Sequence, residues 1–259
     1  MLLETHINLL IDFKTFTMQN NQNVSDFYDD YVSLQRKTGI NDRIYGLYKR
    51  LLELGLKDTS TVLELGCGIG TLTHLLSFKI KQGKIEAIDI SGASIEYAKQ
   101  EIKNANIRFK TQDVTDFTAE LKAFDFITLF DVLEHIPLEK HASFFQRISN
   151  VMTVDSFFVI NLPNPDFIEH DISQEADSLQ IIDQPVPLPD LIKQLDEAGL
   201  ELLFFEKYGI WNIDEYQWFV LRKKRNFIQV PIETILTFKQ RLVRRFVRLR
   251  INQWNKKWQ

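Results

Sequence analysis

The chain has 259 residues, of which 44% are hydrophobic and 25% charged, and its formal net charge is −4. This length suits one α/β domain with extensions, or at most two small domains, and the hydrophobic fraction is enough for a buried core. The single cysteine, Cys67, excludes a disulfide framework and a cysteine-rich zinc site, so we expect a cytoplasmic protein.

The N-terminal residues, MLLETHINLLIDF, do not have the build of a signal peptide. Glu4 and Asp12 interrupt the apolar run, and no basic residue precedes it. No run in the chain approaches the ~18 apolar residues of a membrane span. A polar stretch begins at Met18, which leaves open whether translation starts at Met1 or at Met18.

Helix and strand patterns then alternate along the chain. Aromatic and aliphatic residues at helical spacing predict a helical segment over residues 26–56. Strands are predicted at 61–65, 84–88, 107–111, 124–130 and 157–161, with helices at 71–79, 93–103, 117–121 and 138–152. A helix at 188–198 and two strands at 200–205 and 216–221 follow. This order predicts a Rossmann-like, doubly wound, mostly parallel sheet with a C-terminal antiparallel strand pair.

Three segments are expected from this pattern. Residues 1–57 form an N-terminal helical lid, residues 58–225 form the α/β domain, and residues 226–259 form a basic C-terminal helix. The domain carries an insertion at about 163–187, where prolines and polar residues interrupt regular structure.

A glycine-rich loop follows the first predicted strand, in TVLELGCGIGTLTH at residues 61–74. Ligands of such sheets bind beyond the carboxyl ends of the strands. Gly66, Gly68 and Gly70 would let a ligand lie against bare backbone, next to the free N–H groups of the following helix. The glycines alone also fit a tight turn or the loop of an NAD enzyme.

Three acidic residues at successive strand ends narrow this prediction. Glu64 is unsuited to a pyrophosphate but suits a ligand with an amine and a sulfonium. Asp89 can accept hydrogen bonds from ribose hydroxyls. Asp113 can accept from an adenine amino group while Val114 packs on the ring. Either aspartate alone would serve equally as a helix cap or turn residue, but three acids beside a glycine loop are hard to obtain by accident.

With these residues the sequence resembles the class I S-adenosylmethionine-dependent methyltransferases. VLELGCGIG is similar to their first motif, IEAIDIS to the segment with the second-strand acid, TQDVTDF to the segment with the adenine-site acid, and FDFITLFDVLEHIP to the fourth-strand block. The resemblance covers about residues 26–221 and implies S-adenosyl-L-methionine as the cofactor. It says little about the methyl acceptor.

The resemblance also implies a cofactor site. Its candidate residues are Gly66 and Gly68 under the methionine part, Glu64 at the amino group, Asp89 at the ribose, Asp113 and Val114 at the adenine, and Phe130 beside the methyl group. Ile90, next to Asp89, is a further candidate for cofactor binding. Arg43 matches only loosely an N-terminal arginine that some members direct at the methionine carboxylate. A surface arginine explains it equally well. Cys67 is interpreted as a small buried filler.

His135, in DVLEHIP, is the candidate general base, because a neutral imidazole accepts protons near pH 7. It would otherwise orient the loop before Pro137. Asp131, Glu134 and His135 also resemble the divalent-metal cluster of some ubiquinone-pathway and small-RNA 3′-end methyltransferases. Metal-free relatives carry the same LEH residues, so a divalent metal is the less favoured cofactor.

The expected reaction is methyl transfer to oxygen on a small-molecule, glycan or lipid-linked acceptor. Tyr28 and Tyr31 are candidates for a lid, and polar residues at and after the fifth strand, Asn161, Asn164, His170 and Gln180, are candidates for reading acceptor hydroxyls. Two alternatives stay open. One is a metal-assisted RNA-end methyltransferase, and the other is a non-catalytic regulator that binds the cofactor.

The C-terminal segment is strongly basic. Residues 221–259 contain 12 Lys/Arg and one acid, Glu233, so this segment carries +11 and the remainder (31 − 12) − (35 − 1) = −15. Its pattern predicts a basic amphipathic helix with apolar residues at Ile235, Phe238, Leu242, Phe246 and Leu249. The candidate partners are the inner face of a membrane, the α/β domain or a second subunit in a homodimer, and, less favoured, nucleic acid.

Overall fold

The computed structural model describes residue 28 and residues 31–174 and 183–256. The chain divides into two compact units, Met1–Lys224 and Arg225–Gln259. Within the described ranges no helix is both long and apolar enough to cross a membrane.

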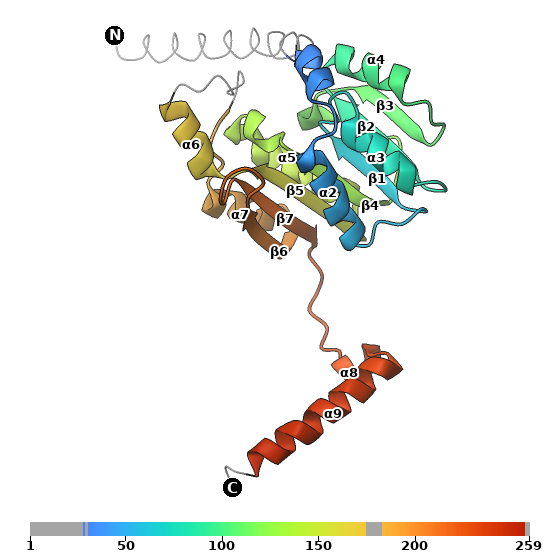
Figure 1. The fold of residues 1–259 in the computed structure, drawn as a ribbon, viewed down its shortest axis with the longest axis vertical. Helices are drawn as coiled ribbons and strands as arrows, with labels where there is room; N and C mark the ends of the chain where they lie inside the picture. Colours follow the sequence, from blue (N-terminus) through green and yellow to red (C-terminus); the bar gives the residue numbers. More distant parts are fainter. Residues whose placement is uncertain (1–27, 29–30, 175–182, 257–259) are drawn as a thin grey trace. The chain divides into compact units, whose positions relative to one another are not determined.

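A seven-stranded sheet organises the described part of the first unit (Figure 1). Its strands are β1 (Thr61–Leu65), β2 (Lys84–Asp89), β3 (Ile107–Thr111), β4 (Phe124–Phe130), β5 (Met152–Pro163), β6 (Leu200–Tyr208) and β7 (Tyr216–Lys223), in the spatial order β3-β2-β1-β4-β5-β7-β6. Strands β1 to β5 pair in parallel, whereas β7 is antiparallel to both β5 and β6. The predicted mostly parallel sheet with a C-terminal antiparallel pair is confirmed.

Successive side chains of the central strands enter two different apolar layers. In β1, Leu63 and Leu65 belong to one buried cluster, and Val62 belongs to the other. The first cluster includes residues of α5 (His141–Val151) and α7 (Leu188–Glu197). The second includes residues of α2 (Asp42–Glu53), α3 (Thr71–Lys79) and α4 (Gly92–Glu101). Helices therefore cover both faces of the sheet. A ligand of such a sheet binds beyond the carboxyl ends of the strands.

Most predicted elements are present, and two predictions need correction. The helical segment over 26–56 is interrupted in the described residues: residues 31–38 are helical, Gly39 has φ 56°, and Asn41 caps α2 through Ile44 N. The helix predicted at 117–121 is absent. A single 3₁₀ turn, η1 (Val114–Asp116), precedes this stretch, and the backbone N–H groups of Glu120 and Leu121 donate to the buried Glu86 carboxylate.

Elements beyond β4 position the rest of the site. Two 3₁₀ turns, η2 (Leu133–His135) and η3 (Leu138–Lys140), connect β4 to α5. Helix α6 (Pro165–Ser173) begins two residues after β5 ends, with Pro165 in its first turn. Gln180, within the insertion, lies outside the described residues.

The second unit contains α8 (Ile232–Ile235) and α9 (Phe238–Asn255). A capping box at the start of α9 joins Thr237 and Gln240. The spacing of Ile235 predicts that it belongs to the same apolar stripe as Phe238 and Leu242. In the structure Ile235 instead ends the separate short helix α8.

Candidate active site

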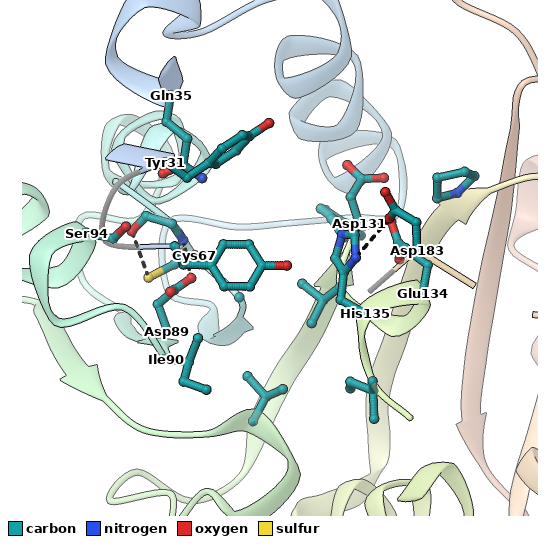
Figure 2. Close-up of a pocket in the computed structure, with 18 of the residues that line it drawn as sticks. Tyr31, Gln35, Cys67, Asp89, Ile90, Ser94, Asp131, Glu134, His135 and Asp183 are labelled. Atoms are coloured by element: carbon teal, nitrogen blue, oxygen red, sulfur yellow. Dashed lines mark hydrogen bonds and ion pairs between the residues drawn. The ribbon is translucent and has the colours of Figure 1, made fainter. Parts of the chain in front are cut away.

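A cavity of about 560 Å³ lies at the carboxyl ends of β1, β2 and β4 (Figure 2). All the residues that the sequence nominates for cofactor binding, catalysis or metal binding line it: Arg43, Glu64, Gly66, Gly68, Asp89, Ile90, Asp113, Val114, Phe130, Asp131, Glu134 and His135. The parallel topology brings these residues together because successive strand ends meet at one edge of the sheet.

The glycine loop is anchored to the end of β2. The N–H groups of Gly66 and Cys67 both donate to Ile88 O, at 2.8 and 3.0 Å, and Gly68 N donates to the Asp89 carboxylate at 2.6 Å. Gly66 and Gly68 have φ angles of 77° and 52°, in the left-handed region that favours glycine. The sequence after β1 thus encodes a fixed loop rather than a flexible one.

Side chains cannot be added to this loop without displacing the far wall of the cavity. A Cβ on Gly66 would lie 2.1 Å from Val132 Cγ2, and one on Gly68 would lie 2.8 Å from Gln35 Nε2. The bare backbone therefore keeps a narrow space open between the loop, the end of β4 and the helical residues near Gln35.

Glu64 is buried at the base of the cavity. Its carboxylate accepts a 2.6 Å hydrogen bond from Thr73 Oγ1, at the start of α3. Burial raises the pKa of Glu64 to about 8, and nearby Asp89 adds to the rise. A cationic group placed beside this carboxylate would reverse that shift, because an opposite charge favours the ionised form.

The two aspartates at the ends of β2 and β3 also organise their own loops. Asp89 accepts from Gly68 N and, at 2.9 Å, from Ser91 N, and the Ser91 side chain in turn caps α4. Asp113 accepts from the backbone and hydroxyl of Thr115 at 2.7 and 2.8 Å. Both carboxylates therefore do the structural work of a cap while lining the cavity.

Cys67 is buried beside these residues, with its Sγ 3.6 Å from Gly68 O. Burial raises the pKa of the thiol, and the carboxylates of Asp89 and Glu64 raise it further. The thiol consequently stays protonated near neutral pH, in line with its interpretation as a filler and not a nucleophile.

Arg43 forms an ion pair across the cavity. Its Nη1 lies 2.6 Å from Asp131 Oδ2, and Asn161 Nδ2 donates to the other oxygen, Asp131 Oδ1, at 2.8 Å. Asp131 raises the pKa of the Arg43 guanidinium. Asp131 itself has φ 55°, an uncommon backbone conformation that aspartate tolerates better than most residues. The ion pair holds this strained strand end in place.

His135 is held by a carboxylate that the sequence did not predict. Asp183 Oδ1 lies 3.0 Å from His135 Nδ1, as Figure 2 shows. His135 Nε2 lies 3.8 Å from Glu134 Oε1, and the Tyr28 ring packs edge-on at a centroid distance of 6.2 Å. Because an ionised carboxylate only accepts, Nδ1 carries the proton and Nε2 keeps a lone pair in the neutral ring.

Glu134 is almost fully buried next to this histidine. Burial raises its pKa to about 7; His135 opposes the rise, and Asp131 and Asp183 add to it. Glu134 Oε2 has no hydrogen-bonding partner within the described parts of the chain. An unsatisfied buried oxygen is costly, so this atom is positioned to interact with a ligand.

The proposed metal cluster does not assemble in this arrangement. Among the described residues no group of three His, Cys, Asp or Glu side chains has the arrangement of a metal site. Asp131 instead pairs with Arg43, and His135 with Asp183. These pairings use the Asp131 and His135 side chains that the predicted metal cluster would need.

The N-terminal helical residues cover the cavity. Tyr28, Tyr31 and Gln35 line it, and Tyr28 and Tyr31 pack edge to face at 6.4 Å. Burial raises the pKa of the Tyr28 hydroxyl, reinforced by Glu134 and Asp183, so this group remains a hydrogen-bond donor. The closing of these residues over a bound ligand stays a prediction.

Three of the residues predicted to hydrogen-bond to the acceptor lie in the described parts of the chain, Asn161, Asn164 and His170, and none of the three lines the cavity. Asn161 is buried and bonded to Asp131 and Tyr208, and Asn164 is buried and bonded to Asp214 O. The His170 side chain is 69% exposed, and His170 is not part of the cavity wall. Asp183 and Gln35, which do line the wall, were missed because neither belongs to a motif or to a regular hydrophobic period.

Known methyltransferases share part of this sequence and its fold. A family model described as a methyltransferase domain matches residues 56–218. Over 107 residues the chain is 32% identical to a malonyl-[acyl-carrier protein] O-methyltransferase of Acetivibrio thermocellus, covering 41% of this chain and 35% of that protein. Over 79 residues it is 38% identical to a ubiquinone biosynthesis O-methyltransferase of Coxiella burnetii, covering 29% and 32%.

The chain therefore aligns with about a third of the length of these curated relatives. Among solved structures, a magnesium protoporphyrin IX methyltransferase from Synechocystis PCC 6803, crystallised with bound SAH, superposes with a TM-score of 0.62 at 16% identity. That match covers 79% of this chain and 99% of the other. At such identity the likeness establishes a common fold.

Proposed function

The chain belongs to the methyltransferase domain family, with the class I S-adenosylmethionine-dependent fold, and we propose that it transfers a methyl group to a hydroxyl oxygen of a small-molecule, glycan or lipid-linked acceptor. The observation that carries this proposal is the His135–Asp183 pair at 3.0 Å, beside a cavity whose other end is a glycine loop ringed by acids.

The residues at the glycine loop fit the cofactor in shape and in charge. Glu64 and Asp89 would hold the amino group and the ribose, and Asp113 with Val114 would frame the adenine. Any side chain on Gly66 would fill the space. When bound, S-adenosyl-L-methionine supplies a methyl group already activated on a sulfonium. The remaining task of the protein is to orient the acceptor and accept its proton, and orientation alone can contribute ~7–11 kcal/mol.

His135 is suited to accept that proton. Its Nδ1 faces Asp183, which leaves Nε2 as the basic nitrogen and stabilises the imidazolium formed on protonation. A positioned base of this kind typically contributes about 10²–10⁴-fold in rate. Glu134, 3.8 Å from Nε2 and with a pKa raised to about 7 by burial, is placed to share a hydrogen bond with the acceptor hydroxyl.

The charge of the cavity favours a neutral or cationic acceptor over an anionic one. Eight acidic residues line its described wall against two basic ones, Arg43 and Lys140: Glu64, Asp89, Asp113, Asp131, Glu134, Glu139, Asp171 and Asp183. Burial raises the pKa of Glu64 to about 8 and that of Glu134 to about 7, so these two supply only part of the negative charge near neutral pH. Such a field raises the local concentration of cations and disfavours phosphates and carboxylates. Apolar side chains near His135, including Ile136, Phe167 and Ile168, would contact the body of the acceptor.

The two alternatives fit the site less well. An RNA end would bring phosphates into an acidic cavity, and the described residues supply no metal cluster to offset them. A non-catalytic cofactor-binding regulator would not need a histidine held in one tautomer. The malonyl-type carboxyl acceptor named for one relative is likewise disfavoured by the same charges.

Two measurements test the proposal. Calorimetry should detect binding of S-adenosylmethionine and S-adenosylhomocysteine but not of NADH. Transfer of tritium from methyl-labelled cofactor should then be screened with four acceptor panels: phenols and quinols, sugar glycosides, primary amines, and carboxylic acids. We expect incorporation in a hydroxyl panel, with His135→Ala sparing cofactor affinity and lowering turnover by at least ~10²-fold. Incorporation confined to the amines would contradict transfer to oxygen, and incorporation confined to the acids would contradict transfer to a hydroxyl group.

A further inference from the structure

The helix α9 presents a large apolar surface that nothing in the methyl-transfer site requires. Within Phe238–Asn255 no residue is buried. Its eight large apolar side chains are between 43% and 81% exposed: Phe238, Leu242, Val243, Phe246, Val247, Leu249, Ile251 and Trp254. Four of them, Phe238, Leu242, Phe246 and Leu249, fall on one face of the helix, and a contiguous exposed apolar stripe of this kind usually marks an interaction surface.

The charges on α9 are all of one sign. The helix contains six basic residues and no acid: Lys239, Arg241, Arg244, Arg245, Arg248 and Arg250. Phe238, Leu242, Phe246 and Leu249 are spaced by four, four and three residues and form the apolar stripe on one face. The other four apolar side chains, Val243, Val247, Ile251 and Trp254, lie on the opposite side of the helix. Arg241, Arg245 and Arg248 border this stripe on one side, and Lys239 and Arg250 border it on the other.

We propose that α9 lies in the interface of a lipid bilayer rich in anionic phospholipid, with its apolar stripe in the acyl boundary and the flanking basic side chains at the headgroups. Long basic side chains can reach the headgroups while their methylene stems stay in the apolar layer. An anionic surface supplies negative charge along both borders of the stripe at once. This inference is independent of the methyl acceptor.

The other occupants fit less of the helix. A nucleic acid would pair with the arginines and leave the phenylalanine and leucine stripe in water. A protein groove, whether in a second copy or elsewhere, would have to carry carboxylates along both rims of one hydrophobic channel. A bilayer surface accommodates both the apolar stripe and the basic residues on its two borders without a dedicated partner.

Vesicle flotation of the full-length protein tests the proposal. We expect binding to phosphatidylglycerol/phosphatidylcholine vesicles and at least ten-fold weaker binding to phosphatidylcholine alone or at high salt. Two combined variants, Arg241→Gln/Arg244→Gln/Arg245→Gln/Arg248→Gln and Phe238→Ser/Phe246→Ser/Leu249→Ser, should each weaken binding by at least ten-fold. Calorimetry with S-adenosylhomocysteine should show that neither variant alters the first unit.

A matched charge control separates the helix from overall charge. Four exposed lysines of the first unit, Lys57, Lys84, Lys103 and Lys122, are changed together to Gln, which removes the same four charges. This variant should float as the unmodified protein does. Equal loss of binding in the control, or full binding by the serine variant, would overturn the proposal.

Two further arms identify the competing occupants. If the protein binds a labelled RNA or DNA oligomer through the arginines, is unaffected by the serine variant and does not float, α9 is a nucleic-acid helix and the proposal fails. If vesicles are not bound and sedimentation velocity shows a dimer that the serine variant dissociates, the stripe is a subunit interface and the proposal fails equally.

Discussion

Asp183 Oδ1 lies 3.0 Å from His135 Nδ1, joining the end of the insertion to the η2 turn that follows β4. We expect Asp183→Asn to lower kcat by about 10²-fold or more while leaving affinity for S-adenosylhomocysteine unchanged, because the histidine loses the carboxylate that fixes its tautomer and stabilises its imidazolium. Turnover would be followed with the acceptor that the hydroxyl panels identify.

A purely structural role for Asp183 would give a different pattern. The acidic limb of the kcat profile should move to lower pH in Asp183→Asn, because the protonated ring loses its anionic partner. Asp190→Asn, an exposed carboxylate in the first turn of α7, is the matched control and should behave as the unmodified enzyme. A lowered kcat with an unshifted pH profile would assign Asp183 to loop packing alone.

Glu64 is expected to make cofactor affinity dependent on pH. Burial raises its pKa to about 8 in the ligand-free protein, so binding an ammonium group requires loss of a proton at lower pH. Affinity for S-adenosylhomocysteine should therefore increase by up to about ten-fold per pH unit between pH 6 and 8 and level off above it. Glu64→Gln should bind more weakly at pH 8 and lack this slope. An unchanged slope in the variant would place the titrating group elsewhere.

The same residue predicts how stability responds to pH in the absence of ligand. The pKa of Glu64 rises from 4.5 to about 8 on folding, so the folded chain holds this proton more tightly than the unfolded chain. The contribution to the free energy of unfolding is present below pH 4.5 and is lost as pH rises toward 8. Between pH 5 and 8 the difference in Tm, Glu64→Gln minus unmodified protein, should grow. A constant difference would show that Glu64 is ionised throughout.

The placement of the cofactor acids could be predicted from sequence because it follows from local order. Apolar runs define β1, β2 and β3, and parallel pairing puts the residues after each run at one edge. Glu64, Asp89 and Asp113 therefore had to converge. The glycines that follow β1 likewise predicted the bare backbone against which the cofactor would lie.

The other half of the site depends on contacts between distant segments. Asp183 reaches His135 from a loop without periodicity, and Arg43 crosses from α2 to the end of β4 to pair with Asp131. The helix wrongly predicted at 117–121 has a similar cause. The local sequence is compatible with a helix. However, the backbone N–H groups of Glu120 and Leu121 donate to the carboxylate of Glu86, which is fully buried in β2, and so are not available for helical hydrogen bonds.

Asp89 is expected to be indispensable for cofactor binding. Asp89→Ala should reduce affinity for S-adenosylhomocysteine by at least ~10²-fold, because the carboxylate would be lost both to the ribose and to Gly68 N, which it holds at 2.6 Å. Asp89→Asn keeps an acceptor for the loop and should recover part of the affinity. Calorimetry of both variants distinguishes the two contributions, and unchanged affinity in Asp89→Ala would refute the assignment of the ribose site.

Gly66→Ala tests whether the loop geometry itself is required. Gly66 has φ 77°, and an added Cβ would lie 2.1 Å from Val132 Cγ2. The left-handed conformation costs about 1–2 kcal/mol for a non-glycine residue, and overpacking typically adds about 1–3 kcal/mol. We expect chemical denaturation to show a loss of about 2–5 kcal/mol and calorimetry to show no cofactor binding.

Two matched variants divide this loss into its causes. Gly92→Ala is the control, because a Cβ there meets nothing within 4 Å and its φ lies outside the left-handed range. It should leave both stability and binding intact. In Gly66→Ala/Val132→Ala the steric part should be relieved while the backbone cost remains, so the double variant should lose less than the sum of the two single variants. Strict additivity would mean that Val132 does not set the width of the cavity, and that backbone conformation alone explains the glycine.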